Sequence, residues 1–230
     1  AREFGARSVG LIAPYLGYMR QDTRFHRGEA VSTPLFAQFL EEAFDWLVTV
    51  DPHLHRVERL QSLYRMPTAH VSATPAVARW IAETVPDAVL IGPDSESGQW
   101  VADIAARSGM PWQVLAKERH GDYDVRVSLP DPAAVSGRTP VLIDDIVSSG
   151  HTIQETLAHL RRLSLPPPLL VAIHPVFAGN AYARLQAAGL ARIVSTDTIA
   201  HPSNAIALGA DLADAASTLM TASTDSPEDP

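Results

Sequence analysis

Residues 141–153, VLIDDIVSSGHTI, join a short apolar run to two acidic residues and then to a turn of small residues. The apolar run is typical of a strand that is buried on both faces of a parallel sheet. The turn leads into a predicted helix, because Ile153, Leu157 and Leu160 recur at helical spacing. Backbone N–H groups in such a turn, at the start of a helix, favour phosphate binding. An ordinary capped turn has a similar pattern, but two acids at a buried strand end are costly without a partner.

The rest of the chain alternates apolar runs with amphipathic stretches. Further apolar runs lie at residues 9–13, 46–50, 88–91 and 169–173. Further helices are predicted to begin at Ser32, Thr74 and Asn180, and a proline follows closely at the first two starts. Alternation of strands and helices predicts an α/β fold with parallel sheets.

Composition limits the possible classes of function. The 230 residues carry 18 basic and 26 acidic side chains, a net charge of −8, and binding to a nucleic acid polymer needs a basic surface. No apolar run approaches the roughly 18 residues of a membrane-spanning helix. We therefore expect neither a nucleic acid polymer nor a membrane as partner. The sequence has no cysteine, which excludes disulfides, thiolate metal sites and a cysteine nucleophile.

The domain organisation is predicted from a weakly patterned stretch at residues 63–73 that contains Pro67. We expect an N-terminal domain at residues 1–68 and a C-terminal domain at residues 69–220. Residues 221–230 are rich in Ser, Thr, Asp and Pro and are predicted to form a disordered tail. The chain opens without Met in what resembles a helix end, so we expect the first domain to be incomplete.

The chain has no G-x-x-x-x-G-K-[ST] motif, which excludes a P-loop. Instead, the pattern at residues 141–153 resembles the phosphoribosyl pyrophosphate (PRPP) signature of the type I phosphoribosyltransferase fold. Six more segments resemble, in the same order, motifs of the ribose-phosphate pyrophosphokinase (PRPP synthetase) family. They are APYLGYMRQD (13–22), TVDPHLH (49–55), IGPD (91–94), KER (117–119), VFAGNA (176–181) and TDTI (196–199).

This resemblance implies two tandem phosphoribosyltransferase-like α/β domains with parallel sheets, the first of them incomplete. It also implies a transferase that moves the diphosphoryl group of Mg·ATP to the 1-hydroxyl of ribose 5-phosphate, giving PRPP and AMP. Mg²⁺ is the implied cofactor. A homo-oligomer, a dimer or a hexamer, and a cytoplasmic location are also expected.

The resemblance assigns the contacts with ATP and metal to four residues. Arg20 and Gln21 would bind ATP, and a guanidinium can pair two phosphate oxygens at once. His53 and Asp94 would hold Mg²⁺, and both follow apolar runs, where ligands of parallel sheets collect. A surface salt bridge for Arg20 and a purely structural strand-end histidine are the alternatives.

The same resemblance makes Lys117 and Arg119 the catalytic pair. They lie on a predicted hairpin arm at residues 116–124, which would close over ATP and bring two cations to the developing charge. Lys117 is the only lysine among the 18 basic residues. A solvated charged turn is the alternative.

Ribose 5-phosphate would bind Arg119 and the residues that follow the apolar run at 141–143. They are Asp144, Asp145, Ser148, Ser149, Gly150, His151 and Thr152. His151 replaces a glycine of the family pattern, so its side chain either donates to the phosphate or shifts the loop. This and other departures suggest a divergent bacterial branch.

Two other classes of protein remain open on the sequence. A non-catalytic regulatory protein of the same family should have lost the catalytic arm, whereas Lys117 and Arg119 are present. A PRPP-dependent phosphoribosyltransferase would need only one such domain and would not explain Arg20, Gln21 or His53. Family members also carry an N-terminal segment with a Phe-Asp-Gly-Glu loop, which this chain would lack.

Overall fold

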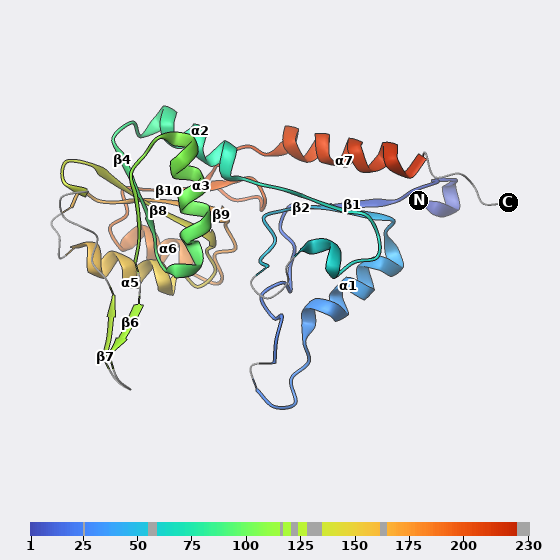
Figure 1. Cartoon of the computed structure of the whole chain (residues 1–230), viewed down its shortest axis with the longest axis horizontal. Helices are drawn as coiled ribbons and strands as arrows, with labels where there is room; N and C mark the ends of the chain where they lie inside the picture. Colours follow the sequence, from blue (N-terminus) through green and yellow to red (C-terminus); the bar gives the residue numbers. More distant parts are fainter. Residues whose placement is uncertain are drawn as a thin grey trace. The chain divides into compact units, whose positions relative to one another are not determined.

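A computed structural model of the chain describes residues 1–24, 26–54, 59–115, 117–120, 124–127, 135–161 and 165–224 (Figure 1). The chain divides into two compact units, Ala1–Ser72 with Leu208–Pro230, and Ala73–Ala207. Each unit contains a parallel sheet and helices, which confirms the predicted α/β fold class. No helix in the described ranges has the length and apolar character needed to cross a membrane.

The first unit is built on three parallel strands in the order β1-β2-β3. Its first elements are η1 (Arg2–Phe4), β1 (Gly10–Ala13), α1 (Ser32–Ala43), β2 (Trp46–Val50), η2 (Leu60–Ser62) and β3 (Thr68–Val71). Ala37 and Leu40 of α1 belong to one buried cluster with Leu47 of β2. Helix α1 therefore covers one face of this sheet.

The C-terminal helix α7 (Gly209–Thr224) covers the other face. Alternate residues of a strand point to opposite faces, so Leu47 points towards α1 whereas the fully buried Val48 and Val50 point away from it. Helix α7 contacts β2 and β3 and buries Leu212 and Ala216. Figure 1 shows α1 and α7 on opposite sides of these strands.

The C-terminal part of the chain returns to the first unit, and the observed division therefore differs from the expected domain boundaries. The sequence placed residues 69–220 in one domain, whereas the first unit regains the chain at Leu208. The physical reason is that a parallel sheet needs cover on both faces, and α1 supplies only one. The expected tail at 221–230 overlaps the last turn of α7, and residues 225–230 lie outside the described residues.

Gly10 is required by the packing of β1 on β2. The two strands run parallel with Gly10 opposite Trp46. A Cβ atom at Gly10 would lie 1.9 Å from Cε2 of the Trp46 indole, which is buried. The ring therefore occupies the space that any side chain at position 10 would need.

We expect Gly10→Ala to destabilise the first unit by about 1–3 kcal/mol, the usual cost of overpacking a core. Hydrogen–deuterium exchange should become faster in β1 and β2 and stay unchanged in the sheet of the second unit. Gly17→Ala is the matched control, because a Cβ there would meet no atom within 4 Å. Unchanged exchange in Gly10→Ala would contradict the packing argument.

The second unit is built on six parallel strands in the order β11-β10-β9-β8-β4-β5. The strands are β4 (Ala88–Gly92), β5 (Trp112–Val114), β8 (Thr139–Ile146), β9 (Leu169–His174), β10 (Arg192–Thr196) and β11 (Asn204–Ile206). The helical elements are α2 (Thr74–Thr84), η3 (Ser95–Ser97), α3 (Gly98–Ser108), α5 (His151–Leu160) and α6 (Ala181–Ala187).

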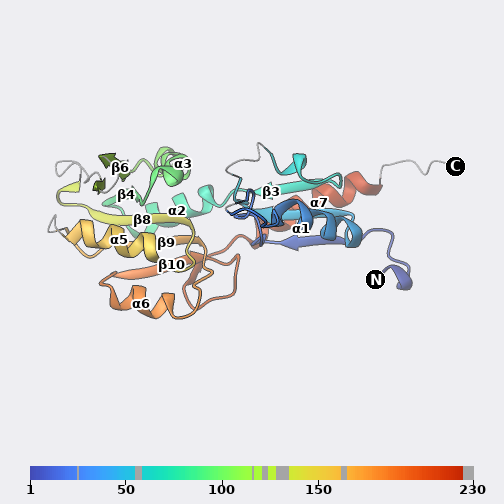
Figure 2. The same ribbon diagram turned by 90° about the horizontal axis from the view of Figure 1, so that it is seen from below.

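Helices α5 and α6 pack on the same face of this sheet (Figure 2). Ile153 and Leu157 of α5 and Leu185 of α6 share one buried cluster with Leu142 of β8 and Leu170 of β9. Helices α2 and α3 pack against each other, and α3 contacts β4 and β5. The predicted helix starts near residues 32, 74, 150 and 180 agree with α1, α2, α5 and α6.

The predicted arm is present as a hairpin of two short antiparallel strands. They are β6 (Lys117–His120) and β7 (Asp124–Val127). Lys117 lies opposite Val127 and Arg119 opposite Val125 in the backbone register. Residues 121–123, which join the two strands, lie outside the described residues.

Candidate functional site

Four neighbouring parallel strands of the second unit end at one edge of its sheet. At this edge β4 leads into Asp94, β8 carries Asp144 near its end, β9 leads to Phe177 and β10 leads to Thr198. Ligands of open α/β sheets bind outside the carboxyl ends of the strands. This edge is therefore the candidate site, and it contains most of the predicted ribose 5-phosphate residues.

Three carboxylates approach one another where β4 and β8 end. Burial raises the pKa of Asp144 well above its ordinary value, and repulsion by Asp145 and then Asp94 raises that pKa further. Asp145 is buried, and its Oδ1 accepts the N–H of Ile146 at 2.8 Å. A cluster of carboxyl groups in this setting favours a ligand that donates hydrogen bonds or carries positive charge.

Asp94 is held by the turn that it begins. Its Oδ1 accepts the N–H groups of Glu96 and Ser97, both at 3.1 Å, and Ser97 Oγ donates to its carbonyl at 2.6 Å. A Cβ at Gly92 would lie 2.4 Å from Ser97 Oγ, so a larger residue there would displace the Ser97 hydroxyl from this turn. The Pro-Asp-Ser-Glu-Ser-Gly sequence at residues 93–98 therefore forms a capped 3-10 turn that fixes the carboxylate at the sheet edge.

The turn between β8 and α5 has the backbone of an anion site. Gly150 has φ of +72°, and a Cβ there would lie 2.9 Å from Leu185 Cδ1, so only glycine fits. Helix α5 begins at the next residue. Within the described residues, the backbone N–H groups of Ser148, Ser149 and Gly150 have no protein acceptor. N–H groups at a helix N-terminus favour phosphate.

The side chain of His151 lies on the exposed surface of α5. Its Nε2 lies 3.2 Å from Oε1 of Glu155, one turn further along α5, and the ring is largely exposed. The pairing is an ordinary interaction between residues four apart on a helix. The histidine that replaces a family glycine is accommodated here as the first residue of α5. A contact of His151 or of Thr152 with ligand stays a prediction.

Arg20 and Gln21 lie in the first unit, in the turns that follow β1. Gln21 Nε2 donates to the carbonyl of Ala30 at 3.2 Å, and its Oε1 accepts the hydroxyl of Ser32. The Gln21 amide therefore braces the segment that leads into α1. Arg20 is exposed beside it. Their contact with ATP is untested by this geometry and stays a prediction.

His53 also lies in the first unit, three residues after β2, and is partly buried. Its predicted partner at the metal, Asp94, belongs to the second unit. No group of three or more His, Asp or Glu side chains in the described part of the chain is arranged to hold a metal ion. A magnesium site at His53 and Asp94 stays a prediction.

Lys117 and Arg119 are placed by their backbone alone, on strand β6 of the hairpin. Their side chains lie outside the described part of the chain. Strand β6 follows Leu115, which is buried in the same cluster as α5 and α6. The arm therefore starts from the core beneath the candidate site.

Two features of this edge are not predicted by the sequence. Arg184 of α6 donates from Nη2 to the carbonyl of Ser149 at 3.0 Å. His201 packs with Phe177 and Tyr182, with ring centroids 4.7 and 4.6 Å from its own, and burial lowers the pKa of His201. The spacing of residues in the sequence predicts neither the Arg184 hydrogen bond nor the packing of His201, because the partners belong to different structural elements.

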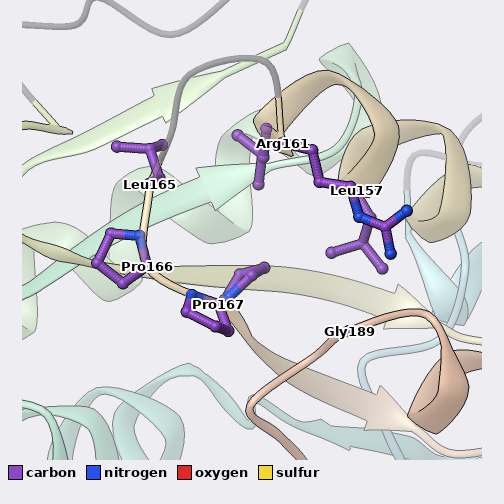
Figure 3. Close-up of a pocket in the computed structure, with 8 residues that line it drawn as sticks. Leu157, Arg161, Leu165, Pro166, Pro167 and Gly189 are labelled. Carbon is purple, nitrogen blue, oxygen red and sulfur yellow. The ribbon is translucent and has the colours of Figure 1, made fainter.

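A separate pocket of about 180 Å³ lies at the opposite edge of the sheet, where β9 and β10 begin (Figure 3). Leucines, prolines and a glycine form most of its wall, and the guanidinium of Arg161 donates to the carbonyl of Ala188 at 2.5 Å. The lining includes Leu157, Leu160, Arg161, Leu165, Pro166, Pro167, Pro168 and Gly189. It contains none of the predicted site residues.

Comparison with known proteins assigns the chain to a family. Residues 69–202 match the family described as phosphoribosyl transferase domain. A ribose-phosphate pyrophosphokinase of Methanopyrus kandleri is 34% identical over 221 residues, which cover 95% of this chain and 75% of that relative. The chain belongs to the ribose-phosphate pyrophosphokinase family.

Other members of the ribose-phosphate pyrophosphokinase family agree with this assignment. Ribose-phosphate pyrophosphokinase 2 of Archaeoglobus fulgidus is 34% identical over 188 residues, which cover 82% of this chain and 67% of that protein. The crystal structure of phosphoribosylpyrophosphate synthetase from Mycobacterium smegmatis superposes with a TM-score of 0.78 and 25% identity, covering 97% of this chain and 74% of that one.

These comparisons confirm the family and the fold that the sequence motifs predicted. The two relatives with 34% identity are archaeal, whereas the departures in the motifs suggested a bacterial branch. The placement within the family therefore shifts towards archaeal-type members.

The raised pKa of Asp144 predicts a pH-dependent stability. That pKa exceeds the ordinary carboxyl value of about 4. The folded protein is therefore most stable, with respect to this group, below pH 4, and it loses stability as the pH rises through the raised pKa. Asp144→Asn should therefore raise the Tm of the ligand-free protein at pH 8. Each kcal/mol gained in the free energy of unfolding should raise Tm by about 2–4 °C.

Calorimetry at pH 4 and pH 8 measures this difference. The gain should nearly vanish at pH 4, where both proteins carry an uncharged side chain at position 144. Asp214→Asn, exposed on α7 beyond its first turn, is the matched control and should leave Tm unchanged. A gain for Asp144→Asn that is equal at both pH values would contradict the electrostatic explanation.

Proposed function

We propose that the chain transfers the diphosphoryl group of Mg·ATP to the 1-hydroxyl of ribose 5-phosphate, giving PRPP and AMP. Membership of the ribose-phosphate pyrophosphokinase family supports this reaction. The single structural observation that carries it is the acidic strand end of β8 beside a turn whose three successive N–H groups have no acceptor among the described residues. That pair of features suits a sugar phosphate.

The two parts of the site have complementary chemistry for ribose 5-phosphate. Carboxylates accept hydrogen bonds from vicinal hydroxyls, so we assign the ribose hydroxyls to Asp144 and Asp145. The 5-phosphate is assigned to the turn of Ser148, Ser149 and Gly150 at the N-terminus of α5. His151 and Thr152 begin that helix and complete the proposed contact.

The chemical step needs alignment and neutralisation of charge. The 1-hydroxyl attacks the β-phosphorus of ATP in line, and AMP leaves. We propose that Lys117 and Arg119 approach from the hairpin and stabilise negative charge that grows on the transferred group. Arg20 and Gln21 are proposed to position ATP, which makes the reaction effectively unimolecular.

The donor set fits Mg²⁺ as a partly hydrated ion. Mg²⁺ prefers oxygen, keeps several waters and commonly binds through one or two carboxylates plus substrate phosphates. Asp94 offers such a carboxylate, fixed by its two N–H donors. We propose that Asp94 holds the ion directly and His53 through water, where the ion would neutralise ATP phosphate charge.

We also propose a homo-oligomer, a dimer or a hexamer. Tyr18, Leu35 and Phe39 are each more than half exposed, and Phe36 lies between the rings of Tyr18 and Phe39, with centroids 4.7 and 6.2 Å away. Exposed apolar patches of this kind mark interaction surfaces. A monomeric mass in light scattering would contradict the proposal.

A cytoplasmic location is proposed because both substrates are intracellular metabolites.

Ribose 5-phosphate binding tests the proposed function. Isothermal titration at pH 8 should detect binding to the wild-type chain, and Asp144→Asn should weaken it by about tenfold or more, because the amide accepts hydrogen bonds from the ribose hydroxyls less strongly than a carboxylate does. Asp214→Asn should bind like wild type. Absence of binding to the wild-type chain, or full binding by Asp144→Asn, would overturn the assignment.

Lys117→Ala should lower kcat for AMP formation by about 10²–10³ and leave the KM for ribose 5-phosphate nearly unchanged. The reason is that the ammonium meets charge that develops only in the transition state. Lys117→Arg should restore activity in part, because a planar guanidinium places its charge differently.

Arg126→Ala is the matched control on the same hairpin. In the backbone register Arg126 lies opposite Glu118, whereas Lys117 and Arg119 lie opposite Val127 and Val125. It should retain near wild-type kcat. If Lys117→Ala instead keeps kcat and raises only the KM for ATP, the lysine binds ATP and has no catalytic role.

A further inference from the structure

The turn after β8 is held by its carbonyl groups. Four successive carbonyls, those of Val147, Ser148, Ser149 and Gly150, each accept a hydrogen bond from the protein. The donors are the N–H of Phe177 at 2.8 Å, the N–H of Ala178 at 3.0 Å, Nη2 of Arg184 at 3.0 Å and the N–H of Gln154 at 3.0 Å. Each of these carbonyl groups is therefore held by a hydrogen bond from the protein.

This arrangement decides where the N–H groups point. A peptide unit is planar and trans, so the N–H of one residue is antiparallel to the carbonyl of the residue before it. Holding the carbonyls of Val147, Ser148 and Ser149 thus turns the N–H groups of Ser148, Ser149 and Gly150 to the opposite side. These are the three N–H groups that have no acceptor among the described residues.

Three of the four donors are backbone groups, and two of these come from a strained turn. Phe177 has φ of +37°, a region that bulky side chains rarely adopt. In this conformation the successive N–H groups of Phe177 and Ala178 donate to the successive carbonyls of Val147 and Ser148. The unfavourable backbone conformation of Phe177 thus occurs at the segment that holds the turn.

Arg184 is the only side chain among the four donors. It extends from α6, whose Leu185 packs within 2.9 Å of the position of a Cβ on Gly150, so α6 lies directly against the turn. The Ser149–Gly150 peptide is the unit that depends on a side chain for its orientation. The N–H of Gly150 is therefore the anion donor most sensitive to substitution.

We propose that Arg184 is a positioning residue for the sugar-phosphate site: it holds the Ser149 carbonyl and so aims the Gly150 N–H at the 5-phosphate of ribose 5-phosphate. This inference rests on the proposed function. It assigns Arg184 no contact with the reacting atoms. Its effect passes through one peptide unit.

The variants Arg184→Met and Arg184→Lys test the proposal. Met keeps the apolar stem and removes the donor, so affinity for ribose 5-phosphate in isothermal titration should fall about tenfold. Lys keeps one donor and should restore most of that affinity. The KM for ATP should stay unchanged in both, because the turn does not contact ATP in the proposed arrangement.

The matched control is Arg161→Met. Arg161 also donates from Nη2 to a backbone carbonyl, that of Ala188, but at the opposite edge of the same sheet (Figure 3). It should bind ribose 5-phosphate like wild type. A general loss of stability from removing an exposed arginine would affect both Met variants alike.

The amide resonance of Gly150 in the ligand-free protein separates positioning from simple attraction between the guanidinium and the phosphate. It should shift in Arg184→Met and remain in place in Arg161→Met. An unchanged Gly150 resonance, or unchanged ribose 5-phosphate affinity in Arg184→Met, overturns the proposal while the proposed function stands. No binding by the wild-type chain overturns both.

Discussion

Burial of the Asp144 carboxyl beside Asp145 and Asp94 is the constraint that shapes the candidate site of the second unit. These carboxylates meet because β4 and β8 are neighbours and parallel, so their ends coincide at one sheet edge. Burial makes the repulsion stronger, since charge is poorly screened in a protein interior. A fold without a polar ligand would gain stability by replacing Asp144. The unfavourable burial of this carboxyl therefore has a functional explanation.

The elements around this edge hold the acids and the turn in fixed positions. Asp94 is fixed by the 3-10 turn that it caps, and the β8–α5 turn is fixed by contacts from the 177–184 segment. The apolar cluster of α5, α6 and the sheet holds these parts from below. Binding groups that are oriented before the ligand arrives lose less entropy on binding.

The first unit shows how a distant part of the chain can complete a small sheet. Three short strands and α1 leave Val48 and Val50 without cover on one face, and α7 provides that cover from the C-terminus. A boundary read along the chain cannot detect such a return. The moderate apolar patterning of α7 does not specify which sheet it covers.

The local patterns of the sequence determined the parallel α/β class, most strands and helix starts, the hairpin and the family. They could do so because buried strands, helix caps and short motifs such as residues 141–153 are contiguous in the chain. Only the tertiary structure decided that α7 returns to the first sheet and that Arg184 holds the Ser149 carbonyl. It also decided that Leu185 requires a glycine at position 150. These features depend on residues that are distant in sequence, and their partners become neighbours only when the strands and helices pack.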